Sequence, residues 1–214
     1  MASTEPRTNV VPYPEALRHR YVAVMFVDLD NFMRICIDDP PQAVFDLLSD
    51  FQSMVTDTVA SFRGELNSYQ GDGVLATFED VANRANCATR TLRCARKILE
   101  QIRALGLRGT KGRTPSVSVS IGLQYGEVWT RMIKTSRRFG PTLIGDAVNV
   151  AARLEKHAGA LGAKIVVGDD LIQRAWHEGA SSVSDLAQFL NVGPLVVRGR
   201  QTPVDVWKLQ NQAG

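Results

Sequence analysis

Residues 21–32 read YVAVMFVDLDNF. The first eight, Tyr21–Asp28, form a continuous β-branched and apolar run that ends in an acidic residue. Such a run is typical of a buried central strand. A carboxylate at the end of a buried strand is costly unless another group compensates its charge. We therefore expect this strand in the middle of a sheet, with Asp28 facing a cation or a ligand.

In the segments around this strand, apolar residues recur either with the spacing of an amphipathic helix or with that of a β-strand. Expected elements are, in chain order, a strand over 21–28, a helix over 44–62, strands over 65–70 and 74–78, a helix from about 81 to 105, strands over 116–125 and 128–133, a helix over 146–157, a strand over 164–167, a helix near 170–177, and strands over 195–198 and 204–209. This order predicts an α+β fold with a ferredoxin-like βαββαβ core and appended C-terminal strands. Residues 1–20 contain three prolines and no sustained periodicity, so we expect a flexible leader before a single domain over 21–214.

Composition is that of an ordinary globular protein, with 44% hydrophobic and 22% charged residues among 214. A net charge of +3 is too small for a dedicated nucleic-acid binder. No apolar run approaches the ~20 residues that a membrane span needs, and no signal peptide opens the chain, so a cytoplasmic protein is expected. Cys87 and Cys94, seven residues apart on a helical pattern, are expected to be buried, reduced thiols.

Asp72 stands in the turn Gly71-Asp72-Gly73 between the two short strands. Flanking glycines allow a backbone to approach a ligand closely. If this hairpin pairs beside the first strand, Asp28 and Asp72 meet at one end of the sheet. Two carboxylates and a backbone carbonyl such as that of Leu29 suit Mg²⁺ or Mn²⁺. For either aspartate alone, an ordinary turn or helix-cap role is the more common explanation.

A second group of polar residues lies in Gly145–Arg153, GDAVNVAAR. Asn149 and Arg153 are four residues apart and therefore share one helix face. An arginine can bind a phosphate with two hydrogen bonds, and a neighbouring amide can hold a sugar oxygen. The alternative is a solvated helix face, which accounts for most such pairs.

Together these segments resemble the class III adenylate and guanylate cyclases. In that family the first strand ends in F-x-D-[IL]-x-x-F, a hairpin carries G-D-G, and a later helix reads G-D-x-V-N-x-A-[AS]-R. The stretches of this chain that match these three motifs are, in order, Phe26–Phe32, Gly71–Gly73 and Gly145–Arg153. In addition, Gly122–Val128 resembles the family's G-I-x-x-G-x-V, and Val197–Leu209 resembles its ending V-K-G…P-V-x-V-[YW]-x-L. Several motifs in register over residues 21–209 make the resemblance specific.

The resemblance implies an enzyme that closes a nucleoside triphosphate into a 3′,5′-cyclic monophosphate and releases pyrophosphate. Asp28 and Asp72 would hold two divalent cations, Mg²⁺ or Mn²⁺. Asn149 would orient the ribose, and Arg153 would neutralise charge on the α-phosphate. Arg198 stands where the family has a phosphate-binding lysine. The family builds each site from two subunits, which implies a homodimer with two shared sites.

The base-selecting positions depart from the family. Adenylate cyclases usually have Lys, and guanylate cyclases Glu, at the position of Ser68, and Thr142 stands at the partner position. A hydroxyl is short and neutral and specifies neither purine well. A Ser/Thr pair with intact catalytic residues resembles the pyrimidine cyclases of bacterial anti-phage (Pycsar) systems, which make cyclic UMP or cyclic CMP.

A smaller base would leave space in such a pocket, and Tyr69, Trp129 and Arg131 are candidates to fill it. Ser120 stands where many family members have a triphosphate-binding arginine, and Arg131 replaces a usual glycine. UTP is slightly favoured over CTP, because a hydroxyl pair can accept from uracil N3–H and donate to O4.

Two alternatives stay open. One is an adenylate cyclase with atypical base-selecting residues. The other is a non-catalytic cyclase-homology module that binds nucleotide or only dimerises; its usual mark, loss of a metal aspartate or of the Asn/Arg pair, is absent here. Diguanylate cyclases and polymerase palms share a similar core, but the G-G-D-E-F motif is missing, and 214 residues leave no room for polymerase fingers and thumb.

Overall fold

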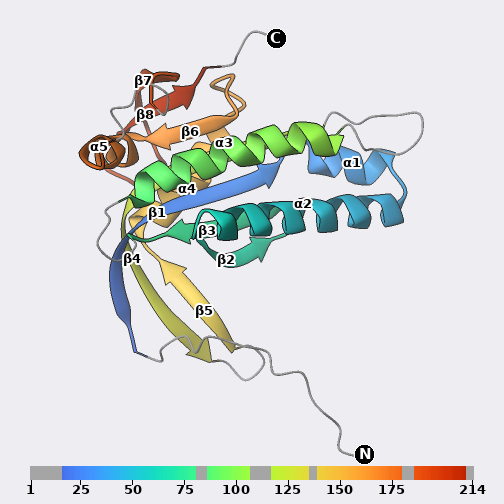
Figure 1. Cartoon of the computed structure of the whole chain (residues 1–214), viewed down its shortest axis with the longest axis horizontal. Helices are drawn as coiled ribbons and strands as arrows, with labels where there is room; N and C mark the ends of the chain where they lie inside the picture. Colours follow the sequence, from blue (N-terminus) through green and yellow to red (C-terminus); the bar gives the residue numbers. More distant parts are fainter. Residues whose placement is uncertain (1–15, 81–85, 107–116, 135–138, 180–185, 211–214) are drawn as a thin grey trace, which may run out of the picture.

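The computed structural model describes residues 16–80, 86–106, 117–134, 139–179 and 186–210. The elements are, in chain order, β1 (Arg18–Leu29), α1 (Phe32–Asp38), α2 (Pro41–Ser61), β2 (Glu65–Gln70), β3 (Gly73–Phe78), α3 (Cys87–Gly106), β4 (Val119–Lys134), β5 (Phe139–Ile144), α4 (Asp146–His157), β6 (Ile165–Gly168), α5 (Asp169–His177), β7 (Phe189–Leu195) and β8 (Val204–Leu209). The strands form one sheet in the order β2-β3-β1-β4-β6-β8-β7, with β5 paired to β4 (Figure 1). The predicted βαββαβ core with appended C-terminal strands is confirmed, and β1 is central as expected.

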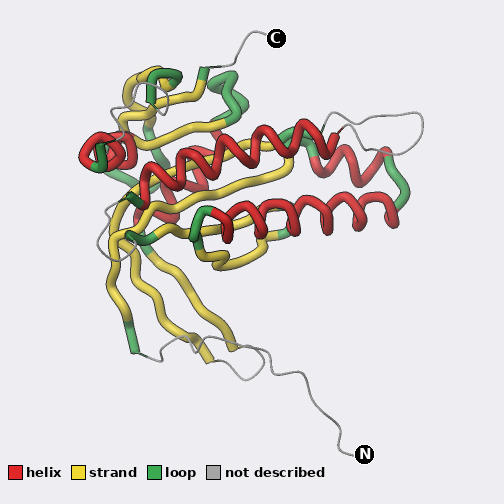
Figure 2. The backbone as a smooth tube through the Cα atoms, viewed as in Figure 1, coloured by secondary structure: helices red, strands yellow, loops and turns green. Residues whose placement is uncertain are grey.

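Helices cover both faces of the sheet. The two long helices α2 and α3 lie together on one face, and α4 lies on the other (Figures 1 and 2). Successive residues of β1 point to opposite faces of the sheet. Ala23, Met25 and Val27 pack toward α2 and α3. Val24 and Phe26 pack toward α4. This alternation explains why the strand is apolar at every position, because both faces are covered.

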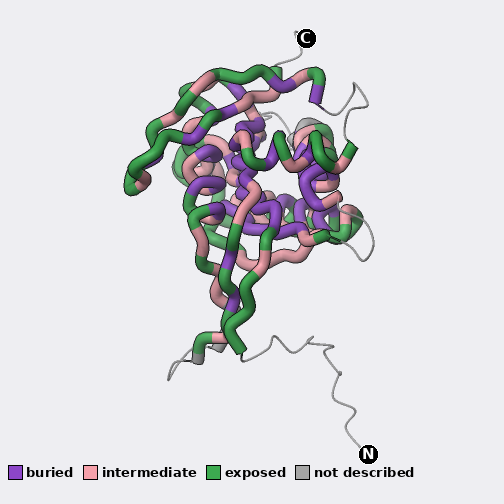
Figure 3. The backbone as a smooth tube through the Cα atoms, turned by 90° about the vertical axis from the view of Figure 1, so that its left-hand side faces the viewer, coloured by how far each residue is buried: buried purple, intermediate pink, exposed green. Residues whose placement is uncertain are grey.

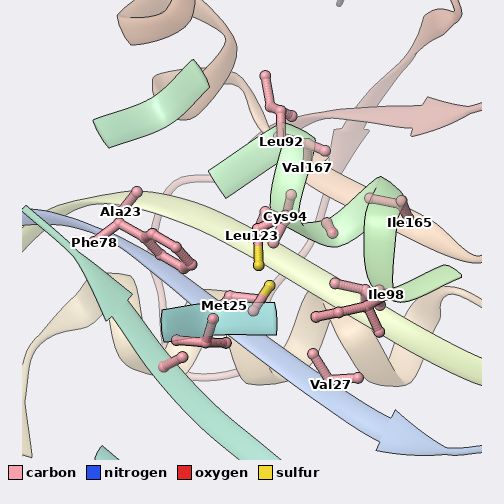
Figure 4. Packing of buried hydrophobic residues seen from close by; sticks show 14 of the residues in the cluster. Ala23, Met25, Val27, Phe78, Leu92, Cys94, Ile98, Leu123, Ile165 and Val167 are labelled. Carbon is pink, nitrogen blue, oxygen red and sulfur yellow. The ribbon is translucent and has the colours of Figure 1, made fainter. Parts of the chain in front are cut away.

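The larger core lies between β1, β3, β4 and the long helices (Figure 4). Cys94 of α3 packs there close to Met25 of β1, and Cys87 is also fully buried. Burial raises the pKa of both thiols to about 12, so they stay protonated. The predicted buried thiols are confirmed, and both cysteines are unpaired.

The hairpin predicted over 116–133 is wrong. Residues 119–134 form one long strand, β4, which pairs with β1 from Arg18 to Leu29 and also with β5. Gly126 lies inside this strand and leaves room for α4, because an ideal Cβ on it would lie 3.1 Å from the Cβ of Ala147. Gly126, which falls in the predicted gap between the two strands, is therefore a packing position inside β4.

Other elements also differ from the prediction. Helix α1 and strand β5 were not expected, β1 begins at Arg18 instead of Tyr21, and α2 begins at Pro41 instead of residue 44. The strand predicted over 195–198 is wrong, because β7 ends at Leu195 and residues 196–198 lie in the loop before β8. The predicted leader falls largely on residues 1–15, outside the described part of the chain.

Part of the sheet projects from the body as an arm made of the N-terminal half of β1, the C-terminal half of β4, and β5 (Figure 1). Its surface is mostly exposed or half-buried (Figure 3). Large apolar side chains exposed on it are Tyr21, Trp129, Ile133 and Ile144. In the described ranges, no helix is both long and apolar enough to cross a membrane.

Candidate active site

Strand pairing brings the acidic residues to one level of the sheet. Asp28 on β1 lies opposite Gly73 of β3 on one side and opposite Ser120 of β4 on the other. Gly71 adopts a φ of +69°, which a glycine accommodates without strain, and the turn then returns the chain beside Asp28. Asp72 therefore stands next to the end of β1, as predicted.

The two carboxylates repel each other. Burial, and then the negative charges of Asp72 and Asp30, raise the pKa of Asp28 to about 6. Gly73 keeps the backbone close, since an ideal Cβ on it would lie 3.0 Å from Oδ1 of Asp28. A hard divalent cation would relieve the repulsion between Asp28 and Asp72 and would favour the charged form of Asp28. The residues therefore fit the expected cations, with the buried Leu29 carbonyl at the same strand end.

Asp30, two residues further on, is compensated within the protein. Its carboxylate accepts hydrogen bonds from Nζ of Lys164 at 2.6 Å, from Oγ of Ser118 at 2.5 Å and from Oγ of Ser120 at 2.6 Å. Although burial opposes ionisation, these donors lower the pKa of Asp30 below its usual value. Ser120, at the position of the expected arginine, is buried and bonded to this aspartate.

The C-terminal part of α4 reaches the same region. An ideal Cβ on Gly122 would lie 2.0 Å from the carbonyl oxygen of Ala151, so only glycine lets α4 pack this closely on β4. This contact places the buried side chain of Glu155 near Asp28. Burial, and then the charge of Asp28, raise the pKa of Glu155 to about 7. The sequence analysis did not identify Asp30, Glu155 and Lys164 as neighbours of the site. For Asp30, the available signal was a second acidic residue only two positions after Asp28.

The predicted phosphate-binding residues gather around the other side of α4. Asn149 is exposed, and Arg153 is half-buried. An ideal Cβ on Gly199 would lie 3.8 Å from Nη2 of Arg153, so Arg153 faces the loop that carries the exposed Arg198. Arg200 of that loop forms an ion pair of 3.1 Å with Asp146 at the start of α4. Among the described residues, Nη1 of Arg153 is buried and has no hydrogen-bond partner, so this donor is available to a phosphate oxygen.

A β-bulge orients Ser68. The pairing of β2 with β3 shifts between Leu66 and Ser68, so that Ser68 lies opposite Leu75. Leu75 belongs to the cluster on the α4 side of the sheet, and Ser68 therefore faces that side as well. Tyr69 faces the other side, where its hydroxyl lies 2.8 Å from Oγ1 of Thr56 on α2. The idea that Tyr69 fills the base pocket is therefore wrong for this conformation.

Thr142 is half-buried on β5, in the projecting arm. Its direct partner across the ladder is Arg131, and Trp129 lies opposite Ile144 two residues away. Trp129 and Arg131 thus share a face with Thr142 and remain candidates to contact the base. The strands of Ser68 and Thr142 are not neighbours in the sheet.

A second group of ligand-type side chains, Asp80, Cys87 and Glu178, lies at the start of α3. Arg174 occupies its centre and pairs with both acids. Glu178 accepts the backbone N–H groups of Ala88 at 3.0 Å and Thr89 at 2.8 Å. The cluster therefore caps the helix and already contains its cation, so it is not the predicted metal site.

Replacing Glu178 by alanine is expected to lower the free energy of unfolding by about 2–3 kcal/mol, because buried N–H groups and Arg174 lose a charged acceptor. The Glu178 side chain is only 1% exposed. Glu100→Ala removes a carboxylate that is 65% exposed and should change stability by less than about 0.5 kcal/mol. Urea unfolding measures both variants; equal small effects would contradict the capping role.

Known proteins share both the sequence pattern and the fold. Residues 15–210 match the family described as adenylate and guanylate cyclase catalytic domain. Adenylate cyclase 1 of Rhizobium meliloti (strain 1021) is 24% identical over 188 residues, which are 88% of this chain and 27% of that protein. The chain thus spans about a quarter of that relative's length.

Solved structures of similar fold include the adenylyl cyclase CyaB from P. aeruginosa, with a TM-score of 0.78 at 19% identity over 92% of this chain and 97% of that one. The guanylyl cyclase Cya2 has a TM-score of 0.75 at 20% identity over 90% of this chain and 92% of that one. At 19% and 20% identity, the likeness to these two structures shows only a shared fold. Membership of the family rests on the family match, which extends over residues 15–210. The chain belongs to the adenylate and guanylate cyclase catalytic domain family.

Proposed function

We propose that this domain converts a nucleoside triphosphate, with UTP preferred, into its 3′,5′-cyclic monophosphate and pyrophosphate. The observation that carries the proposal is the presence of both metal-type aspartates, Asp28 and Asp72, and of the Asn149/Arg153 pair, combined with neutral hydroxyls at both base-selecting positions. The product would serve as a second messenger in anti-phage defence, as in the pyrimidine cyclases that this Ser/Thr pair resembles.

Asp28, Asp72 and the carbonyl of Leu29 would hold two Mg²⁺ or Mn²⁺ ions. When bound, these ions lower the pKa of the ribose 3′-hydroxyl and neutralise the triphosphate. The raised pKa of Asp28, caused by burial and by Asp72, supports this role, because a cation would replace the unfavourable repulsion with attraction.

The opposite half-site would bind the sugar and the phosphates. Asn149 orients the ribose, so that its 3′-oxygen faces the α-phosphate. Arg153 neutralises charge that develops there, and its buried Nη1 has an unused donor among the described contacts. Arg198 adds a second guanidinium from the neighbouring loop.

We propose that each active site lies between two copies of the chain. Asp28 and Asp72 lie at the end of β1, whereas Arg153 faces the 196–200 loop on the other side of α4. The projecting arm exposes apolar side chains such as Tyr21, at 57%, and Ile144, at 62%, which a partner subunit would cover. A head-to-tail homodimer would give two equivalent composite sites.

Adenylate cyclase activity is the second candidate. The support for it is that the curated Rhizobium meliloti relative is called an adenylate cyclase. Against it stands Ser68, because the lysine that would donate to adenine N1 is missing.

The wild-type domain with Mn²⁺ is expected to use UTP with a kcat/KM about 10-fold or more above that for ATP or GTP. A buried base edge without a partner costs about 1–3 kcal/mol, and each purine would lack its charged partner here. Ser68→Lys should reduce UTP use, because an ammonium would face the N3–H donor of uracil. Ser53→Lys, at an exposed serine of α2, is the matched control and should have no effect. If ATP is the best substrate, the pyrimidine proposal fails and the second candidate replaces it.

A further inference from the structure

Lys164 immediately precedes β6, and strand pairing places it level with the carboxylates. Strand β6 runs parallel to β4, with Ile165 opposite Ile121, so Lys164 is level with Ser120. Ser120 in turn lies opposite Asp28. Two steps between neighbouring strands therefore separate Asp28 from Lys164, about 10 Å between Cα atoms.

Neighbouring side chains hold the ammonium of Lys164 in place. Nζ lies 2.6 Å from Oδ2 of Asp30 and 3.1 Å from Oγ of Ser118. Asp30 itself is fixed by Ser118 and Ser120 and by its backbone N–H, which donates to the carbonyl of Ser118 at 2.9 Å. The ammonium group is thus positioned by a partly buried carboxylate that is 17% exposed.

This arrangement leaves Lys164 able to bind a ligand. A lysine ammonium has three N–H donors, and two are directed to Asp30 and Ser118. The lysine side chain remains 41% exposed, so the third donor can reach a bound anion. Ser120 lies at the same level on β4, but its hydroxyl is neutral and is bonded to Asp30, so it supplies no positive charge there.

We propose that Lys164 binds the β- and γ-phosphates of the substrate and the pyrophosphate product, and thereby supplies from β6 the cation that Ser120 does not supply from β4. Asp30, Ser118 and Ser120 act as positioning residues for it. The inference rests on the proposed function for its substrate, but pyrophosphate binding can be measured without turnover.

Calorimetric titration of the full chain with inorganic pyrophosphate in excess Mg²⁺ tests this role. Lys164→Met should bind pyrophosphate about tenfold more weakly, as expected for the loss of one charged contact. Lys164→Arg should stay within about threefold of wild type, since it retains the charge. Lys97→Met, at an exposed lysine of α3, should bind as wild type does. Affinity for the cyclic monophosphate, which lacks the β- and γ-phosphates, should not change in any variant.

A rescue variant separates phosphate binding from a purely structural role. Lys164→Met combined with Ser120→Arg should recover pyrophosphate affinity, because a guanidinium on β4 would reach the same level of the sheet. The melting temperature of each variant reports folding. If Lys164→Met remains folded and binds pyrophosphate as Lys97→Met does, the inference is wrong. Lys156 is an exposed lysine whose charge acts on Asp28. If Lys156→Met weakens pyrophosphate binding and Lys164→Met does not, the inference is also wrong.

The outcomes distinguish this inference from the proposed function. Lys164-dependent pyrophosphate binding by a chain that cyclises no nucleotide supports the inference and contradicts the function. Cyclisation with an unchanged KM in Lys164→Met supports the function and contradicts the inference.

Discussion

Asp28→Asn and Asp72→Asn are each expected to reduce kcat/KM for cyclisation roughly 1,000-fold or more in the presence of Mn²⁺. Each substitution removes an anionic ligand from the proposed cation pair, and charge stabilisation by such ions is worth several kcal/mol in the transition state. Initial rates of pyrophosphate release over a range of nucleotide concentrations, at saturating Mn²⁺, measure the loss. Near-normal turnover by either variant would contradict the metal assignment.

Folding provides the control for these variants. Because burial and Asp72 raise the pKa of Asp28 to about 6, an uncharged side chain at position 28 relieves repulsion in the metal-free protein. Asp28→Asn should therefore melt at the same temperature as the wild type or higher when Mg²⁺ and Mn²⁺ are chelated. Asp50→Asn, at an exposed aspartate of α2, should alter neither activity nor melting.

Mixing two inactive variants, Asp28→Ala and Arg153→Ala, is expected to restore about one quarter of wild-type activity. After random exchange of subunits about half of the dimers are heterodimers, and one of their two sites contains only wild-type residues. The other site carries both substitutions. Activity measured after mixing at equal concentrations, with subunit exchange followed by fluorescence transfer between labelled chains, tests this expectation.

A mixture of Asp28→Ala with Asp72→Ala is the matched control. Both residues stand beside the same strand end in one chain, so every composite site would still carry one defect. This mixture should stay inactive even when exchange is complete. Recovery in both mixtures, or in neither after demonstrated exchange, would contradict a site shared between two chains.

Local sequence patterns predicted the central strand, the glycine-flanked turn and the helix of Asn149 correctly. Each of these depends on residues that are close in sequence: an apolar run for β1, two glycines around Asp72, and helical spacing between Asn149 and Arg153. The meeting of Asp28 with Asp72 was also predictable, because a tight hairpin beside a strand has few possible positions.

Features that depend on distant contacts were not predictable in the same way. Gly126 fell between two predicted strands, but it lies inside β4, where it makes space for Ala147 of α4. The bulge at Asn67, which turns Ser68 to the α4 side and leaves Tyr69 beside Thr56, has no local marker. Lys164 meets Asp30 only because β6 pairs in parallel with β4.

The central claim is tested most directly by incubating the wild-type domain with ATP, GTP, CTP and UTP separately, each with Mn²⁺, and resolving the products by chromatography and mass. We expect a 3′,5′-cyclic monophosphate and pyrophosphate in equal amounts, with UTP giving the fastest reaction. If a folded, dimeric protein binds these nucleotides but forms no cyclic product from any of them, the domain is a nucleotide-binding module and the cyclase account is wrong.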